Sequence, residues 1–356
     1  MKLHIFGRYS ALGASTRLRS LQYLPSLAAA GFEIKVSSFF DDAYLTALYG
    51  GKRSDKKLIG YFGDRLRQLR AARGADVIWF EKEALPWVPW AFERRLLPQN
   101  VPYVVDLDDA VFHRYDQHRS AHVRWLLGHK IDRVMQASAC VTAGNEYLAA
   151  RARNTKAPKV EIVPTVIDLT RYDTTKLAAP DGALRVGWIG TPQTWAELAR
   201  PIQSALAPEL ARLGAVFRAV GAELEQRTTE GLEILPWSEN SEVQMIRGMD
   251  IGIMPLPDTP WTRGKCGYKL IQYMACGLPV IASPVGVNVD IVEHGVNGFL
   301  AETPAEWENA VSQLLADPQL RARMGAAGRR KVETDFSLQV WADRVAEILR
   351  AACRKL

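Results

Sequence analysis

Cysteine is scarce in this sequence, and the cysteines that are present form no recognisable pair. Four are scattered along the chain, without a Cys-x-x-Cys spacing and without a nearby histidine to complete a zinc motif: Cys140, Cys266, Cys276 and Cys353. This pattern argues against a disulfide framework and a structural zinc site. Isolated thiols that pack as small apolar side chains are typical of a reduced compartment, so we expect a cytoplasmic protein.

Long apolar runs are also missing. One of the longest, 278–287, is interrupted by proline and glycine and is far shorter than the roughly 20 residues that cross a bilayer. The first residues lead into a short apolar strand, without the apolar segment and cleavage site of a secretory signal. We therefore expect neither an integral membrane protein nor a secreted precursor. The 356 residues, 48% of them apolar, supply the cores of about two domains.

Positive charge is concentrated in the first half of the chain. Residues 1–170 carry a formal charge of +8 and residues 171–356 carry −2. Much of the excess lies in 52–73, where lysines and arginines alternate with apolar residues. Such a basic amphipathic segment can lie on an anionic membrane surface, or it is a solvated helix face that packs on its own domain. The excess is modest and comes with no recognition helix or aromatic platform, so we expect no nucleic-acid partner.

Predicted strands and helices alternate along the chain. Residues 2–6 predict a strand, a helix follows from Ser15 or Thr16 to Gly31, and 32–40 predict the next strand. A strand–helix–strand unit of this length is typical of a right-handed parallel crossover. The other predicted strands are 76–80, 102–107, 139–143, 161–163, 184–189, 216–220, 232–235, 251–254 and 279–282.

An aperiodic segment, 173–183, divides these elements into two series. We predict an α/β fold with a first Rossmann-like domain over residues 1–172 and a second over 183–335. Open parallel sheets bind ligands at the carboxyl ends of their strands, so two such domains place the site in the cleft between them.

The most specific segment is 261–286, which reads WTRGKCGYKLIQYMACGLPVIASPVG. It predicts a helix over 268–275. The apolar positions of this helix share the face that packs on the sheet: Leu270, Ile271 and Met274. Polar positions spaced by four and three residues are expected to share the other face: Lys265, Lys269 and Gln272.

Cations crowd the start of this predicted helix. Arg263, Lys265 and Lys269 lie there with no acid among them, although the helix dipole favours acids at that end. Gly264 and Gly267 let backbone N–H groups approach a ligand closely. The segment therefore indicates an anion site that fits a diphosphate, with a surface cluster of lysines as the alternative.

At this segment the sequence resembles family 4 of the GT-B glycosyltransferases, of the bacterial cell-surface polysaccharide type. In that family E-G-F-G precedes a helix carrying L-L-E-A-M-A-x-G-x-P-V, and its two glutamates fall here on Gly264 and Gln272. The resemblance is specific in 250–300 and looser before 180. It implies two facing Rossmann-like domains with an interdomain cleft, a donor bound mainly by the second domain, an acceptor bound by the first, and a C-terminal helix in 336–356 that packs back on the first.

The resemblance also implies which residues bind the donor. The second family glutamate grips the ribose hydroxyls, a task that Gln272 can perform without charge, whereas Gly264 offers only its backbone N–H. Gly13 falls near the phosphates, and the turn at Gly190 and Thr191, with Thr191 as helix N-cap, faces the diphosphate. That turn lacks the family's cations, which the lysines of the motif are expected to replace. The predicted donor-binding residues are Gly13, Gly190, Thr191, Gly264, Lys265, Cys266, Gly267, Lys269 and Gln272.

Acidic residues follow two neighbouring predicted strands of the first domain. Asp108 takes the position of a family histidine that touches the donor sugar, where a carboxylate accepts hydroxyls or stabilises positive charge at the anomeric carbon. Any one acid is equally compatible with a loop cap, but five acids at adjacent strand ends favour a site. These five are Glu81, Glu83, Asp106, Asp108 and Asp109. We predict as catalytic residues Asp108, Lys269 and Arg263. We predict as acceptor- or sugar-binding residues Glu81, Glu83, Asp109, His113 and His118.

Asp106-Leu107-Asp108 is also a D-x-D motif, which holds a metal in the other large glycosyltransferase fold. His118 and His122 follow at helical spacing, but no third ligand is spaced to complete a site. We predict no metal and no cofactor besides the nucleotide sugar.

These features predict a glycosyltransferase that moves a sugar from a nucleoside-diphosphate sugar to a hydroxyl of a saccharide or lipid-linked acceptor, in cell-envelope polysaccharide synthesis. The resemblance implies retention of configuration and metal independence. We expect a cytoplasmic protein that contacts the inner face of the cytoplasmic membrane. Two alternatives stay open: a nucleotide-sugar 2-epimerase on the same architecture, and a non-catalytic nucleotide-sugar-binding protein.

Overall fold

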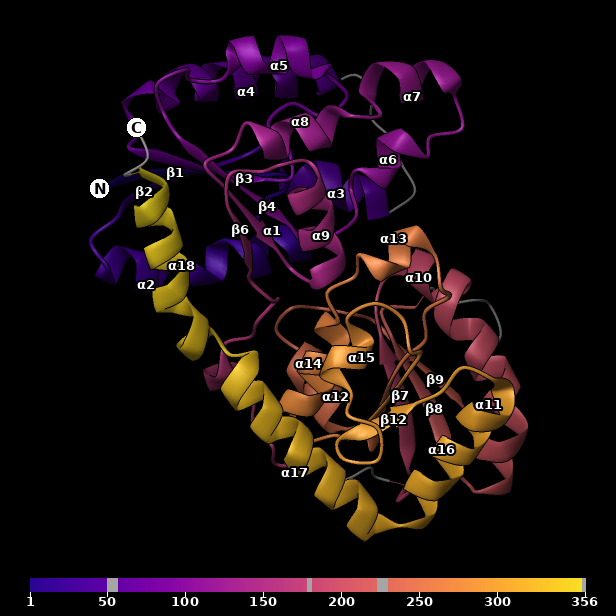
Figure 1. The fold of residues 1–356 in the computed structure, drawn as a ribbon. Coiled ribbons are helices and arrows are strands. Elements are labelled where there is room, and N and C mark those ends of the chain that lie inside the picture. The colour runs from indigo at the N-terminus through magenta and orange to yellow at the C-terminus, as the bar shows by residue number, and fades with distance from the viewer. Residues whose placement is uncertain (50–56, 178–180, 223–229, 354–356) are drawn as a thin grey trace. The chain divides into compact units, whose positions relative to one another are not determined.

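The computed structural model describes residues 1–49, 57–177, 181–222 and 230–353, and the chain divides into two compact units. Unit 1 comprises Met1–Val166, Arg263–Cys266 and Val340–Leu356, and unit 2 comprises Ile167–Thr262 and Gly267–Gln339. Each unit contains one six-stranded parallel sheet with helices on both faces (Figure 1), which confirms the predicted α/β fold. The unit boundaries differ from the predicted ones, most of all in assigning Arg263–Cys266 to unit 1.

The sheet of unit 1 has the strand order β2-β1-β3-β4-β5-β6, and all six strands lie within two residues of their predicted positions. Its strands are β1 (Lys2–Gly7), β2 (Glu33–Ser38), β3 (Val77–Glu81), β4 (Tyr103–Leu107), β5 (Cys140–Ala143) and β6 (Val160–Ile162). Its helices are α1 (Ala14–Arg19), α2 (Leu24–Ala29), α3 (Asp42–Tyr49), α4 (Leu58–Ala71), α5 (Trp90–Leu96), α6 (His113–Asp116), α7 (Ala121–Leu127), α8 (Lys130–Gln136), α9 (Glu146–Asn154) and, from Val340 on, α18 (Leu338–Cys353).

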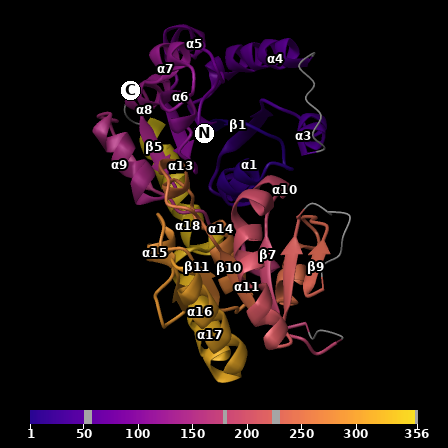
Figure 2. The same ribbon diagram turned by 90° about the vertical axis from the view of Figure 1, so that its right-hand side faces the viewer.

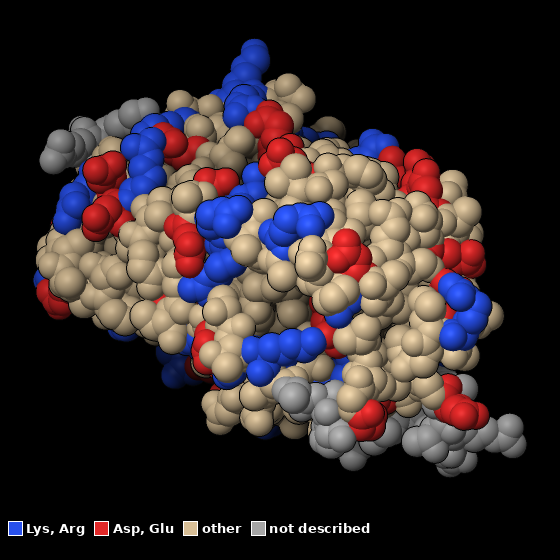
Figure 3. Space-filling view, turned by 90° about the horizontal axis from the view of Figure 1, so that it is seen from below, with Lys and Arg blue, Asp and Glu red and all other residues tan. Residues whose placement is uncertain are grey.

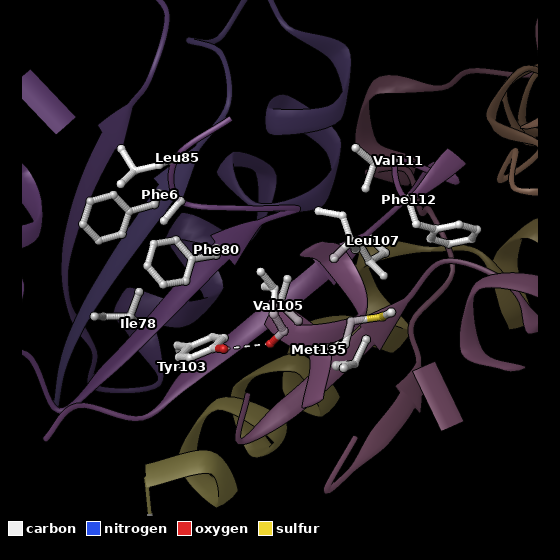
Figure 4. Packing of buried hydrophobic residues seen from close by; sticks show 14 of the residues in the cluster. Phe6, Ile78, Phe80, Leu85, Tyr103, Val105, Leu107, Val111, Phe112 and Met135 are labelled. Atoms are coloured by element: carbon white, nitrogen blue, oxygen red, sulfur yellow. Dashed lines mark hydrogen bonds between the residues drawn. The ribbon is translucent and has the colours of Figure 1, made fainter. Parts of the chain in front are cut away.

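One face of this sheet forms a core in which adjacent strands supply adjacent side chains (Figure 4). The rings of Phe6 and Phe80 lie 5.0 Å apart, and Phe80 meets Tyr103 edge-on at 5.5 Å. The buried Tyr103 hydroxyl donates a hydrogen bond to the carbonyl of Val134 at 2.7 Å, which avoids the cost of an unpaired polar group. This packing fixes the carboxyl ends of β1, β3 and β4, from which the candidate site residues come.

The sheet of unit 2 has the order β12-β11-β10-β7-β8-β9, again with every pair parallel (Figure 2). Its strands are β7 (Arg185–Ile189), β8 (Val216–Val220), β9 (Leu232–Leu235), β10 (Ile251–Met254), β11 (Val280–Ala282) and β12 (Gly298–Leu300). Its helices are α10 (Pro192–Thr194), α11 (Arg200–Arg212), α12 (Glu242–Arg247), α13 (Pro260–Arg263), α14 (Tyr268–Ala275), α15 (Asn288–Ile291), α16 (Pro304–Ala316) and α17 (Pro318–Asp335).

Two elements of unit 2 differ from the prediction. Strand β12 was not predicted, because it has only three residues and follows directly on the turn residues Gly295 and Asn297. The single helix expected after Gly190 is divided into α10, a π-helical segment over Trp195–Ala199, and α11.

Candidate functional site

Charged side chains line the carboxyl ends of three neighbouring strands in unit 1. Arg8 directly follows β1, Glu81 and Lys82 end β3, and Asp108 follows β4. Because β1, β3 and β4 are parallel neighbours, their ends meet at one edge of the sheet. The structure therefore brings the predicted carboxylates together, but it also places cations among them that the sequence analysis did not single out.

Lys82 and Asp108 form a buried ion pair at this edge. Lys82 Nζ lies 2.9 Å from Asp108 Oδ1 and donates to Ser15 Oγ at 3.1 Å, and the Ser15 hydroxyl in turn donates to Asp108 Oδ2. Burial by itself raises the pKa of Asp108, but the charge of Lys82 and the hydrogen bond from Ser15 lower it to about 2. Asp108 is thus an ionised carboxylate in a fixed orientation.

The backbone of Lys82 is strained. Its φ of 67° lies in the left-handed region, where a side chain costs on the order of 1–3 kcal/mol and persists only if its surroundings hold it. Backbone strain of this kind gathers at functional sites. The only sequence signal for Lys82 is its place between two acids at a strand end, which does not reveal the conformation.

The segment Arg263–Cys266 packs on this edge as part of unit 1. Lys265 Nζ lies 2.8 Å from Asp109 Oδ1, and the Cys266 thiol donates to the carbonyl of Asp108 at 3.1 Å. The side-chain amide of Asn145 donates to the carbonyl of Lys265 at 2.9 Å. Lys265 and Asp109, predicted to bind donor and acceptor respectively, are therefore paired with each other.

Gly264 allows this close packing. A Cβ at this position would lie 2.6 Å from the Cβ of Ala110, a distance that side chains do not tolerate. The glycine therefore serves the close approach of two backbones.

The Glu83 carboxylate takes part in a buried network of ion pairs and hydrogen bonds, whereas the sequence predicted that it binds an acceptor. Its carboxylate accepts from Lys130 at 2.5 Å and from the Tyr115 hydroxyl at 2.8 Å, and Arg8 lies 3.4 Å away. Lys130 also lies 2.9 Å from Glu93. Burial raises the pKa of Glu93, whereas in Glu83 the charges of Lys130 and Arg8 outweigh burial and lower it.

Glu81 is also occupied within the unit. Its Oε2 accepts from the backbone N–H of Arg8 at 2.9 Å and from the Thr16 hydroxyl, and its side chain is only 4% exposed. Its predicted contact with acceptor hydroxyls stays a prediction, and it would have to compete with the protein donors that Oε2 already accepts from.

The two aspartates of the D-x-D motif have separate partners. Asp106 accepts two hydrogen bonds from Arg19, at 2.7 and 2.9 Å, and one from Thr142 at 2.6 Å, while Asp108 pairs with Lys82. Within the described ranges, no group of three or more His, Cys, Asp or Glu side chains is placed to hold a metal ion.

His118 and His122 do not lie on one helix, although their spacing of four residues had predicted that they would. Helix α6 ends at Asp116 and α7 begins at Ala121, so the two histidines do not share a helix. His118 Nδ1 accepts from the backbone of Ser120 at 3.1 Å.

His113 has partners for both ring nitrogens. Nδ1 lies 2.8 Å from Asp116 Oδ1, and Nε2 lies 2.8 Å from the Tyr147 hydroxyl. Its predicted contact with a sugar would therefore require one of these bonds to exchange.

In unit 2, helix α14 has the predicted bounds, and its apolar face is buried: Leu270, Ile271 and Met274. The helix follows Gly267, whose φ of 66° turns the chain into the first helical residue. A Cβ on Gly267 would also lie 2.2 Å from Cδ1 of Ile291. Both the conformation and the space therefore require glycine at this helix start.

The predicted shared face of Lys265, Lys269 and Gln272 is wrong. Lys265 precedes the helix, because the left-handed Gly267 starts it two residues later. Gln272 is 2% exposed and donates to the Tyr172 hydroxyl at 3.1 Å, so its amide points into the unit. Lys269 lies over the ring of Trp188, with Nζ 5.2 Å from the ring centroid. Of the three, Lys269 lies closest to the start of the helix.

The turn after β7 is capped as predicted. Thr191 Oγ1 accepts from the backbone of Thr194, and Thr194 Oγ1 accepts from the backbone of Thr191 at 3.0 Å, which forms a capping box before Pro192. Gly190 and Gly13 are both tightly packed, since an added Cβ would lie 2.3 Å from the Trp188 ring and 2.4 Å from the Cβ of Tyr9 respectively.

Part of the chain matches a known protein family. Residues 184–317 match the family described as Glycosyl transferases group 1. Among curated relatives, human alpha-1,3/1,6-mannosyltransferase ALG2 is 36% identical over 75 residues, which cover 21% of this chain and 18% of that enzyme. The stretches that match the first three relatives cover only 18–24% of those proteins.

Solved structures resemble the whole chain. Sucrose-phosphate synthase from Thermosynechococcus elongatus superposes with a TM-score of 0.74 at 16% identity, over 98% of each chain. Anabaena Alr3699/HepE, solved with UDP and glucose, gives 0.71 at 18% identity, over 99% of this chain and all of that one. At these identities the likeness establishes the fold. Residues 184–317 therefore match the group 1 glycosyl transferases, and the whole chain shares the two-domain fold of these solved structures.

Proposed function

We propose that this protein transfers a sugar from a nucleoside-diphosphate sugar to a hydroxyl of a saccharide or lipid-linked acceptor in cell-envelope polysaccharide synthesis. The observation that carries the proposal is the group 1 glycosyl transferase match over residues 184–317. It is supported by the fold shared with HepE, whose structures hold UDP, glucose and UDP-glucose. Both the family 4 subtype and the cytoplasmic location belong to this proposal.

Unit 2 supplies the proposed donor site. The start of α14, with Gly267 and Lys269, offers backbone N–H groups and one cation to a diphosphate. The turn at Gly190 and Thr191 is the second part of the proposed site, although Val220 and Thr194 accept hydrogen bonds from the backbone N–H groups of these two residues. When the sugar leaves, negative charge grows on the diphosphate, and groups fixed in advance stabilise it without reorganisation. The catalytic role predicted for Arg263, which belongs to unit 1, stays a prediction.

Unit 1 supplies the proposed carboxylate. Asp108 is ionised and held by Lys82 and Ser15, so it is suited to stabilise positive charge at an anomeric carbon. Because compensation of the leaving group is assigned to side chains and a helix terminus, we propose a reaction that needs no metal or cofactor. Retention of configuration is proposed from the resemblance to family 4. Turnover unaffected by EDTA would support metal independence, and loss restored by a divalent cation would contradict it.

A panel of UDP-, GDP-, dTDP- and CMP-sugars tests the donor assignment by thermal unfolding. A bound donor stabilises the folded state by mass action, by about 2.7 kcal/mol at a hundredfold excess over Kd. We expect one base to raise the unfolding temperature clearly above the others. No shift from any member of the panel would contradict the proposal.

The same donors incubated without acceptor separate the alternatives. An epimerase would convert the sugar nucleotide, whereas a transferase would leave it intact or hydrolyse it slowly. Tight binding without turnover in the presence of an acceptor extract would favour a non-catalytic binding protein. We expect transfer only when the acceptor is present.

The amphipathic segment proposed to contact a membrane only partly supports that role. Lys52, Arg53, Asp55 and Lys56 lie outside the described residues. In the described part, Tyr61, Phe62 and Leu66 of α4 pack against the core of unit 1, which favours the alternative of a helix face packed on its own domain. The described residues include no helix that is both long and apolar enough to cross a bilayer.

Large apolar side chains are exposed on helices α4, α5 and α7 of unit 1, and Ile59 of α4 is 87% exposed. Phe92 of α5 is 58% exposed, and Trp125 and Leu126 of α7 are 84% and 53% exposed. Helices α4, α5 and α7 lie at the same end of unit 1 in both Figures 1 and 2. The face drawn in Figure 3, by contrast, mixes basic and acidic residues over a mostly uncharged surface. We therefore propose α5 and α7 as the membrane-contacting surface.

Sedimentation with vesicles that contain phosphatidylglycerol tests this surface. We expect binding that weakens with salt and that falls when Trp125 and Leu126 are both changed to Ser, because aromatic and leucine side chains anchor helices at the interface. Val289→Ser, which removes a half-exposed apolar residue from unit 2, serves as the control. Equal binding by all three proteins would contradict the assignment.

A further inference from the structure

Arg8 is a buried cation with one hydrogen-bond donor that no described residue uses. It is 9% exposed, and its guanidinium reaches Glu83 at 3.4 Å, the long end of an ion pair. Glu83 already binds Lys130 and the Tyr115 hydroxyl at shorter distances. In the described part of the chain, Arg8 Nε has no hydrogen-bond partner. A buried guanidinium with an unused donor is costly unless a further acceptor joins it.

Arg114 lies near this group, on α6 beside Tyr115. It is half-buried, and no described residue accepts a hydrogen bond or forms an ion pair with its side chain. Burial and the charge of Arg8 lower the pKa of Arg114, and Glu83 offsets only part of this. The nearby acids are in use, since Asp116 binds His113 and Arg151, and Asp109 binds Lys265.

The local charge is therefore positive. Arg8, Arg114 and Lys130 contribute three positive charges, and the acids that pair with their side chains, Glu83 and Glu93, contribute two negative charges. The other charged groups of this cluster cancel, because Arg65 and Lys82 offset Glu81 and Asp108. One positive charge at the edge of the sheet is left for a ligand to neutralise. Arginine is well suited to this task, because its planar donors fit phosphate and carboxylate groups bidentately.

Trp87 provides an aromatic surface at the same place. Its backbone N–H donates to the Tyr115 hydroxyl at 3.1 Å, and its ring meets Tyr115 and His118 edge-on at 5.2 and 5.8 Å. The ring is 47% exposed, and its φ of 64° is a strained conformation for a bulky residue. A fixed indole with an exposed surface can pack against the C–H face of a sugar ring.

We propose that Arg8, Arg114 and Trp87 form a subsite for an anionic saccharide, with the sugar ring on Trp87 and its phosphate or carboxylate group on the two arginines. The subsite rests on the proposed function, in which unit 1 binds the acceptor, and it defines that acceptor as negatively charged. The reaction that supplies the acceptor is then one that adds a phosphate or an acidic sugar, or that oxidises a sugar to its uronic acid.

Calorimetric titration with glucose, glucose 6-phosphate and glucuronate tests the subsite, because the three probes share a ring and differ in charge. We expect an anionic probe to bind at least about tenfold more tightly than glucose, and the difference to shrink at high salt. The tighter of the two anionic probes identifies the group as phosphate or carboxylate. Equal binding of all three, or no binding of either anion, would overturn the proposal.

Three variants separate the contacts. Arg114→Gln should reduce the affinity for the anions to that for glucose and leave glucose unchanged. Trp87→Asn, which tolerates the left-handed backbone, should weaken all three alike. Arg133→Gln removes an exposed arginine from α8 and should change nothing. Equal losses in Arg114→Gln and Arg133→Gln would show a general charge effect and overturn the subsite.

The nucleotide-sugar panel on the same proteins keeps this test separate from the proposed function. Arg114→Gln should keep the full thermal shift with the donor. A wild-type protein that binds the donor but no anionic sugar contradicts the subsite alone, whereas one that binds anionic sugars but no donor contradicts the proposed function.

Discussion

The two units have the same number of parallel strands but differ at the carboxyl edges of their sheets. In unit 1, charged residues end or follow β1, β3 and β4, and most of their side chains pair with one another. In unit 2, the first residues after β7, β8, β10 and β11 are all uncharged: Gly190, Gly221, Pro255 and Ser283.

Under the proposed function, this difference suits the edge of unit 1 to the acceptor and the edge of unit 2 to the donor. Paired side chains at the edge of unit 1 create a fixed local field, which suits reactive and acceptor groups. The start of α14 in unit 2 offers backbone N–H groups and the cation Lys269, which suits phosphates. The comparison predicts that charge removal in unit 1 affects stability and pH dependence, whereas changes in unit 2 affect donor binding first.

Loss of the Lys130 charge should have the largest effect. Lys130→Met leaves Glu83 and Glu93 buried beside each other without their shared cation, and removal of one partner from a buried ion pair costs about 3–5 kcal/mol. Urea unfolding measures the loss. Lys159→Met, which breaks a half-exposed pair with Glu161, should cost less than about 1 kcal/mol. Similar losses of unfolding free energy in the two variants would contradict this prediction, because the buried ion pairs at the edge of unit 1 would then contribute no more than a surface pair.

Gly267→Ala should have the next largest effect, at the start of α14 in unit 2. The new Cβ meets both a left-handed backbone and Ile291, so we expect a loss of about 1–3 kcal/mol and at least tenfold weaker donor binding. Gly295→Ala is the control, because it has φ of 81° but nothing within 4 Å of the added Cβ. Its cost should come from the backbone alone and leave donor binding intact.

The Lys82–Asp108 pair should set the acid limit of activity. Since the folded-state pKa of Asp108 is lowered to about 2, the pair stabilises the protein above the ordinary carboxyl pKa of about 3.9, and this contribution is lost as the pH falls toward 2. Without Lys82, burial is no longer offset. Lys82→Met should therefore move the acid limbs of activity and stability upward by about one pH unit.

Lys82→Gly separates the charge from the strain. It should shift the acid limb of activity as Lys82→Met does. Its free energy of unfolding should nevertheless exceed that of Lys82→Met by about 1 kcal/mol, because glycine accepts a φ of 67°. An unchanged acid limb in both variants would mean that Lys82 does not control Asp108.

The effect expected at Lys269 is confined to the binding of phosphates. Lys269→Ala should weaken binding of the nucleoside diphosphate by about tenfold, or 1.4 kcal/mol, and leave the free nucleoside unchanged. Lys331→Ala, which removes a lysine paired with Asp335 on α17, is the matched control. Equal losses for diphosphate and nucleoside would remove Lys269 from the phosphate site.

Local patterns in the sequence predicted much of the fold. The strands of unit 1, helix α14 with its buried face, and the N-cap at Thr191 all follow from periodicity and turn chemistry within a few residues. The meeting of the carboxylates follows from parallel topology, because Asp108 and Glu81 end neighbouring strands.

The side-chain partners could not be predicted in the same way. Lys130 is 47 residues from Glu83 in the sequence, and only the packed fold shows that it neutralises that carboxylate and so removes it from the predicted acceptor site. Whether Gln272 faces a ligand or Tyr172 depends on where the helix starts, which the backbone of Gly267 decides. Glycine in a sequence does not reveal the sign of its φ.

The Cys266 thiol gives the molecule an internal reporter. Burial raises the pKa of this thiol far above its ordinary range, and the thiol donates a hydrogen bond to the carbonyl of Asp108. In the packed state it is therefore not the thiolate that reacts with alkylating reagents. Maleimide labelling at this one position, followed by peptide mass spectrometry, therefore times how often the 263–266 segment detaches from Asp108. Slower labelling in the presence of a substrate would measure how firmly that substrate holds the segment in place.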